Sequence, residues 1–135
     1  MAKLRHVAIA VQDPQQAAGM LSSVFDLTEV GRCDNELAEG VFLSDGTISI
    51  AVLNFRADQL GKGLEFRGLH HMGFLVDDME QTRKRLAARG AECVLDRPEG
   101  DEDSFFEVKF MAPQGFLFDV ADSPWIGSEP LESTA

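Results

Sequence analysis

An alternation of large apolar residues with small or polar ones occurs twice along the chain, at residues 4–11 (LRHVAIAV) and 69–76 (LHHMGFLV). Side chains of a strand point alternately to its two faces, so each segment predicts a strand with one large apolar face. The other face carries a histidine, His6 or His71, followed two positions later by alanine or glycine. Such a face leaves a hollow beside the strand, and the matched pair indicates an internal repeat.

Each predicted strand runs into a signal for the start of a helix. Asp13 has Gln16 three residues later, and Asp78 has Gln81 at the same offset. An aspartate at the N-cap with a glutamine at the third helical position is a version of the capping box. These patterns predict one helix after Asp13 and a second after Asp78, the latter ending near residue 89.

Shorter apolar runs bounded by turn residues complete each half of the chain. They lie at residues 27–30, 41–44 and 47–55 in the first half and at residues 91–95, 104–111 and 116–120 in the second. A polar loop is expected at 31–40. Turn residues between the last two runs of each half predict a hairpin there. Both halves therefore have the predicted order β-α-β-β-β.

We predict that residues 1–135 form a single domain. The repeats divide this domain into two modules, a linker and a tail. Module one spans about 4–55, a glycine-containing linker spans 56–68, and module two spans about 69–120. Residues 121–135 lack periodicity, which predicts an extended or frayed tail with Trp125 as its anchor.

The charge and the cysteine content of the chain indicate which partners and which cellular location to expect. The chain has 23 acidic and 12 basic residues and a net charge of −11, which disfavours nucleic acid and membrane surfaces as partners. The two cysteines do not form a CxxC pair, so a reducing, cytoplasmic location is expected. No apolar run has the length of a membrane-spanning helix. A cationic ligand would not be repelled by this charge.

The doubled module, with the segments HHMGFLVDD (70–78) and MAPQGFLFDV (111–120), resembles the vicinal oxygen chelate superfamily. This superfamily includes glyoxalase I, methylmalonyl-CoA epimerase, extradiol dioxygenases, and the bleomycin and fosfomycin resistance proteins. The resemblance extends from residue 4 to about residue 120. It implies an α+β fold in which two tandem βαβββ modules curl into a half-open barrel around a cavity with a divalent metal ion. It also implies a homodimer.

Three side chains fall where the superfamily has metal ligands: His6, His71 and Asp119. Two imidazoles and one carboxylate leave several positions of an octahedral ion to water and substrate. Asp119 also lies among apolar neighbours, where a carboxylate is costly unless it is paired or coordinated. The resemblance therefore implies an Fe, Zn, Mn or Ni site, whose affinity should fall as the pH drops through about 6.5. His70 is expected on the opposite face of a regular strand, at the surface or behind the metal ligands, and its replacement should affect metal binding much less than that of His71.

Module one departs from the superfamily pattern. Alignment of the two hairpin glycines places Ile50 at the position of Asp119, and a slip of one residue offers only Ser49 or Ala51. Neither can replace the acid or amide ligand that glyoxalase I has on this strand, so true glyoxalase I activity is not expected. The three-ligand set is more similar to that of extradiol dioxygenases, although the chain contains no tyrosine.

These features predict a metal-dependent enzyme that acts on a small substrate with vicinal oxygens, as a lyase, an isomerase or an extradiol-type dioxygenase. Glu107 is the best-placed general base among the remaining acids, with Glu36 and Glu39 as further candidates. The alternative is a metal-free binding protein, or an antibiotic-resistance-type sequestering protein. Its acidic cavity would use the aromatic residues Phe42, Phe105, Phe110 and Trp125.

Overall fold

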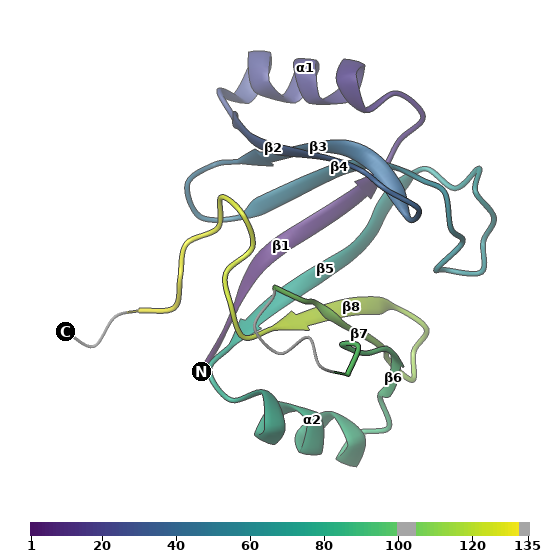
Figure 1. Cartoon of the computed structure of the whole chain (residues 1–135), viewed down its shortest axis with the longest axis vertical. Helices are drawn as coiled ribbons and strands as arrows, with labels where there is room; N and C mark the ends of the chain where they lie inside the picture. The colour runs from purple at the N-terminus through teal and green to yellow at the C-terminus, as the bar shows by residue number, and fades with distance from the viewer. Residues whose placement is uncertain (100–104, 133–135) are drawn as a thin grey trace.

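Strands β1 (Ala2–Ala10) and β5 (Gly68–Val76) lie antiparallel to each other at the centre of the structure (Figure 1). The computed structural model describes residues 1–99 and 105–132. Within these residues, eight strands form one mixed sheet in the order β2-β3-β4-β1-β5-β8-β7-β6. The two predicted histidine strands are therefore neighbours, and the corresponding strands of each module follow outward from them.

Module one continues from β1 with one helix and three strands: α1 (Pro14–Phe25), β2 (Thr28–Asp34), β3 (Ala38–Ser44) and β4 (Ser49–Phe55). Module two repeats this order after β5: α2 (Met79–Ala88), β6 (Glu92–Leu95), β7 (Val108–Met111) and β8 (Leu117–Ala121). In each module the last strand pairs in parallel with the first. The predicted α+β fold of two βαβββ modules is confirmed.

The sheet curls but does not close into a barrel, because its edge strands β2 and β6 are unpaired with each other in the described residues. Helices α1 and α2 lie at opposite ends of the molecule in Figure 1. Asp13 caps α1 by accepting a hydrogen bond from the backbone N–H of Gln16, and Asp78 caps α2 through Gln81. Both helix starts therefore form where the two capping patterns predict them.

The segment 31–40 is the clearest departure from the predicted elements. Its acids and asparagine predict a polar loop, yet β2 and β3 occupy most of it and pair with each other. The turn between them is held by Asn35, whose Oδ1 accepts hydrogen bonds from the backbone N–H groups of Leu37 and Ala38. Polar side chains are tolerated here because β2 is an edge strand with mostly exposed or half-buried residues.

The tail beyond β8 is anchored over a longer stretch than the sequence predicts. Trp125 is buried, with 5% of its surface exposed. Further along, Ser44 donates a hydrogen bond to the carbonyl oxygen of Gly127, and the backbone of Glu129 bonds to Thr47 and to the Arg5 side chain. The tail thus crosses from module two back onto module one (Figure 1). Residues 133–135 of the predicted tail lie outside the described residues.

None of the helices in the described part of the chain has the length and apolar character needed to cross a membrane.

Candidate metal centre

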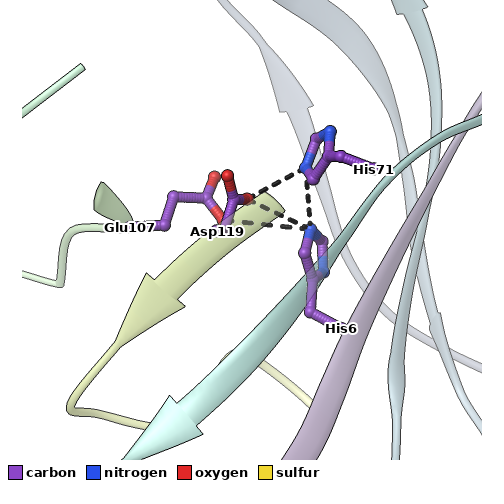
Figure 2. A group of neighbouring side chains, drawn as sticks. All are labelled: His6, His71, Glu107 and Asp119. Atoms are coloured by element: carbon purple, nitrogen blue, oxygen red, sulfur yellow. Dashed lines mark hydrogen bonds and ion pairs between the residues drawn. The ribbon is translucent and has the colours of Figure 1, made fainter. Parts of the chain in front are cut away.

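His6 and His71 face each other across the central pair of strands. In the antiparallel register His6 lies opposite Gly73 and His71 lies opposite Ala8, so each histidine meets a small residue of the neighbouring strand. This leaves room for the imidazoles to turn toward one another, and their Nε2 atoms lie 3.3 Å apart (Figure 2). Both rings are buried. The hollow predicted from the small residues is therefore filled by the two imidazoles.

Asp119 joins this pair from strand β8, which lies parallel to β5. Its side chain is completely buried. Its Oδ2 atom lies 2.9 Å from Nε2 of His71 and 3.8 Å from Nε2 of His6. The fold thus brings together the three residues that the resemblance implies as metal ligands.

Glu107, the candidate general base, lies directly before β7 and beside the same three side chains (Figure 2). Its Oε2 atom is 3.8 Å from Nε2 of His6. One potential ligand atom from each of these four residues lies within 4.8 Å of the others. The other two candidate bases are elsewhere: Glu36 is exposed in the β2–β3 turn, and Glu39 forms an ion pair with Arg56.

The donor set fits a divalent metal ion. Both histidines present Nε2 toward the same point, and Oδ2 of Asp119 is buried there without accepting a hydrogen bond. The other oxygen of Asp119 accepts a hydrogen bond from Lys109, so Oδ2 alone is available to an ion. Imidazole nitrogen together with carboxylate oxygen suits Zn, Fe, Mn and Ni. His6, His71 and Asp119 are therefore the residues that would hold such an ion.

Burial sets the protonation of the imidazoles. It lowers the pKa of His6 to about 4 and the pKa of His71 to about 3, and the positive charge of Lys109 lowers both further. The neutral imidazole, which binds metals, is therefore the favoured form of both residues. Glu107 responds in the opposite direction, because burial and then the charge of Asp119 raise its pKa.

His70 does not point away from the site, and the expectation of a regular strand is wrong here. Ala8 pairs with His71 and Ile9 with Leu69, so His70 is an extra residue in a β-bulge. A bulge turns a side chain away from the regular alternation. The Nδ1 atoms of His70 and His71 consequently share a hydrogen bond of 2.7 Å. His70 also stacks on Phe55, which fixes its ring plane.

Lys109 is a site residue that the sequence patterns did not reveal. It lies opposite Asp119 in the β7–β8 pair, is 5% exposed, and donates to Oδ1 of Asp119 at 2.8 Å. Its place between Val108 and Phe110 in an apolar strand could have indicated a buried lysine. A buried lysine requires a partner of opposite charge. Only the pairing of β7 with β8 identifies that partner.

The position in module one that corresponds to Asp119 is Ala51, and the alignment that placed Ile50 there is wrong by one residue. Ala8 and Gly73 each lie two residues beyond their module's histidine, and they pair with Ala51 and Asp119 respectively. Ile50 points to the other face and contacts the apolar cluster beneath α1. The structure thus bears out that module one supplies no acid on its last strand.

A cavity of about 510 Å³ opens beside the four clustered residues, and apolar side chains dominate its wall. Phe42, Phe105 and Trp125 border it, whereas Phe110 packs in the core of module two. Two polar atoms on its wall, Oγ of Ser49 and Oε1 of Gln59, are buried without hydrogen-bond partners. Three of the four predicted aromatic residues therefore line a cavity that is apolar except near the histidines.

Two modules that share a central strand pair, with two histidines facing a common cavity, define a glyoxalase-like protein. The chain belongs to the Glyoxalase/Bleomycin resistance protein/Dioxygenase superfamily, whose family model matches residues 3–120. No curated protein matches the chain in sequence.

Solved structures show the same fold at low sequence identity. The hypothetical protein BH1468 from Bacillus halodurans C-125 has a TM-score of 0.72 and 18% identity, and 98% of this chain matches 99% of that one. A methylmalonyl-CoA epimerase in complex with methylmalonyl-CoA and NH4+ has a TM-score of 0.72 and 15% identity, with coverages of 96% and 99%. The methylmalonyl-CoA epimerase from Mycobacterium tuberculosis has a TM-score of 0.69 and 19% identity, with coverages of 90% and 87%.

Proposed function

We propose that this protein is a metal-dependent enzyme that acts on a small substrate with two vicinal oxygens. The observation that carries the proposal is the meeting of His6, His71 and Asp119 at one buried point, with Oδ2 of Asp119 unsatisfied there. Buried polar atoms without partners are rare in folded proteins and call for an explanation. A divalent ion would be the partner of both imidazoles and of that oxygen.

Each residue of the centre has a distinct task in this proposal. His6, His71 and Asp119 hold the ion, and Lys109 neutralises the second oxygen of Asp119. The bound ion would stabilise negative charge that develops on a substrate oxygen. Glu107 accepts or returns the proton, because it lies beside the ligands and burial raises its pKa above that of an ordinary glutamate, which makes its carboxylate a stronger base. This favours an isomerase or lyase reaction, with an extradiol-type dioxygenase as the other reaction class.

The substrate is expected to have a compact apolar or aromatic body. The cavity wall away from the histidines is formed by side chains such as Phe42, Leu53 and Phe55. Ser49, which pairs with His6 across β1 and β4, and Gln59 each offer an isolated polar contact on the cavity wall. The epimerase structures with acyl-CoA ligands support a small oxygen-bearing substrate in this type of fold. Lys109, the only lysine or arginine on the described cavity wall, is engaged by Asp119 and is not available for a phosphate.

A metal-free binding protein is the second candidate, and the Lys109–Asp119 ion pair is the observation that favours it. This pair compensates the buried carboxylate without any ion. In that case the apolar cavity binds a hydrophobic ligand and the two histidines serve only as polar groups in its wall.

Metal content separates the two candidates. The protein, purified without a histidine tag, should contain close to one equivalent of a divalent metal. After chelation and dialysis, Zn(II), Fe(II), Mn(II) or Ni(II) should raise its Tm, because a ligand that binds only the folded state stabilises it. The double variant His6→Ala/His71→Ala should show neither effect. A wild-type protein without metal, and with an unchanged Tm in all four ions, rules out the enzyme and leaves the binding protein.

We also propose that the protein forms a homodimer. Large apolar side chains are exposed on several elements, including Val24 and Phe25 of α1, Leu69 of β5 and Val94 of β6. Exposed apolar surface of this extent is typical of protein interfaces. Light scattering at tens of micromolar protein should give twice the monomer mass, and a monomer mass rules the dimer out. The cytoplasmic location stays a prediction from the sequence.

A further inference from the structure

Trp125, the single tryptophan of the chain, contacts two members of the candidate metal centre. Its indole ring stacks on the imidazole of His6, with centroids 5.0 Å apart and planes 5° from parallel. Its Nε1–H donates a hydrogen bond of 2.6 Å to Oε2 of Glu107. The side chain of Glu107 also interacts with Asp119 and lies 3.8 Å from His6, but it is one-third exposed, so the indole N–H adds a restraint from the side of the C-terminal segment.

The two histidines are oriented by different means, and this makes the stacking important. Nδ1 of His71 is bonded to His70, which fixes the His71 ring. Nδ1 of His6 is buried and has no hydrogen-bond partner. Metal-binding histidines are ordinarily oriented by a hydrogen bond at the second nitrogen. At His6 the backbone of Ser49 contacts the ring in place of a side-chain partner, and the stacked indole adds a side-chain restraint on its rotation.

The fold provides a specific place for the indole. A Cβ atom at Gly73 would lie 2.8 Å and 2.9 Å from two carbon atoms of the Trp125 ring, so only glycine leaves room for the ring. The chain after Trp125 is fastened to module one through Gly127 and Glu129. Gly127 and Glu129 bond to Ser44 and Thr47, and Glu129 also accepts a hydrogen bond from Arg5, the neighbour of His6 on β1. The position of the indole is therefore built into both modules.

We infer that Trp125 is a positioning residue that orients His6 by stacking and holds Glu107 at the centre by its indole N–H. This inference rests on the proposed function, because it assigns a purpose to the orientation of both side chains. It extends that proposal to the C-terminal segment, which follows the last strand of the repeat. The site is thus completed by a part of the chain that has no counterpart in module one.

The first test uses metal-free protein and the intrinsic fluorescence of Trp125. In wild-type protein the emission should be blue-shifted and poorly quenched by acrylamide. Glu107→Gln should change the emission intensity or maximum, because it replaces the charged acceptor of the indole N–H. Gly73→Ala should shift the emission to the red and expose it to acrylamide. Unchanged emission in Glu107→Gln, or free quenching of the wild type, overturns the inference whether or not the protein binds metal.

The second test measures Co(II) affinity and the Co(II) visible absorption spectrum. Trp125→Leu should weaken Co(II) binding by about 10- to 100-fold, the usual effect of losing a residue that orients a metal ligand. Trp125→Phe retains a ring over His6 and should lose less. The control is Phe116→Leu, which alters a half-exposed ring that packs against Phe118 away from the centre and should keep the wild-type spectrum. The double variant Glu107→Gln/Trp125→Phe should change the Co(II) affinity and the Co(II) spectrum no more than either single change does.

The outcomes separate this inference from the proposed function. If the wild type binds no Co(II), the proposed function fails, and the fluorescence of metal-free Glu107→Gln and Gly73→Ala decides the positioning of Glu107. If the wild type and folded Trp125→Leu bind Co(II) equally with the same spectrum while His6→Ala does not bind it, the positioning of His6 is overturned. Should Trp125→Leu fail to fold, Trp125→Phe and Gly73→Ala provide the same comparison.

Discussion

The two modules share an order of elements and a histidine on the first strand, but they differ at the strand pair that completes each module. In module two this pair places Lys109 opposite Asp119, and in module one the corresponding pair places Phe42 opposite Ala51. The buried ion pair of one half is therefore an apolar pair in the other. The repeated scaffold supplies two equivalent positions, and their side chains divide the cavity into a charged end and an apolar wall.

The histidines show a second difference between the modules. His71 is supported by the bulged neighbour His70, whereas His6 is supported by Trp125 from outside the repeat. Equivalent backbone positions thus carry equivalent side chains with unlike surroundings. Two kinds of variant test these differences. The first removes a side chain that only one module has, and the second alters side chains that both modules have.

The largest effect on stability is expected from Lys109→Met, which breaks the ion pair that only module two contains. An unpaired buried carboxylate destabilises a fold by about 3–5 kcal/mol, so metal-free Lys109→Met should lose stability on that order. Phe42→Leu, at the corresponding position of module one, should lose much less. Urea unfolding in the presence of a chelator measures both. Equal losses in the two variants would contradict the distinction between the modules.

The next effect concerns metal binding by the residues that the modules share. His6→Ala and His71→Ala should each remove most bound metal, because each takes away one nitrogen ligand. His70→Ala should weaken binding by about 10- to 100-fold, since it frees the ring of His71. A regular strand would place His70 on the opposite face, where its replacement should do much less than that of His71, and the bulge removes the reason for that expectation. Metal analysis and Co(II) titration of the three variants provide the check, and a wild-type affinity of His70→Ala would show that the bond between the rings is not needed.

A dependence on pH follows from the lowered histidine pKa values in both modules. Between pH 6.5 and about 4, the unfolded chain binds a proton at His6 that the folded chain does not bind. The window extends to about 3 for His70 and His71. Metal-free protein should therefore lose stability as the pH falls from 6.5, by up to about 1.4 kcal/mol per pH unit for each histidine. The raised pKa of Glu107 acts in the opposite direction, since it makes stability rise as the pH falls. This one carboxyl group opposes three histidines, so the net effect is a loss of stability.

Urea unfolding at pH 7, 6 and 5 measures this slope, and metal-free His6→Ala is the matched variant with one fewer histidine. Its slope should be smaller than that of the wild type. The same pKa values also change the expected metal behaviour, because the folded site keeps its imidazoles neutral well below pH 6.5. Metal loss in acid should then coincide with unfolding. A slope that does not differ between wild type and His6→Ala would rule out the depressed pKa of that ring.

The smallest effect is expected at the two helix starts, where the modules are most alike. Asp13→Ala and Asp78→Ala each remove a side-chain acceptor at an N-cap. Each should cost about 1 kcal/mol, the usual value for loss of such a cap. Asp13→Asn and Asp78→Asn should retain most of the stability because asparagine also caps. Thermal unfolding tests the equivalence, and a cost confined to one helix would show that the two starts are not alike in energy.

The helices, the strands and their repetition could be predicted from the sequence, because they depend on local patterns. The alternation around His6 and His71 identified the two central strands, and the offsets after Asp13 and Asp78 identified the helix starts. The same local patterns gave the order of elements in each module. His6, His71 and Asp119 were selected by their resemblance to the ligand positions of a superfamily, and the fold brings those three side chains together.

The surroundings of these residues could not be predicted in the same way, because their contacts depend on strand register and on segments distant in sequence. The bulge at His70 shifts one residue of β5 relative to β1, which no alternation pattern contains. The partner of Lys109 follows from the pairing of β7 with β8, and Ala51 is placed by the register of β4. Trp125 reaches His6 through a tail without periodicity. Local patterns determine the face of a strand on which a side chain lies. Strand register, and the return of the C-terminal segment to module one, determine which residues that side chain contacts.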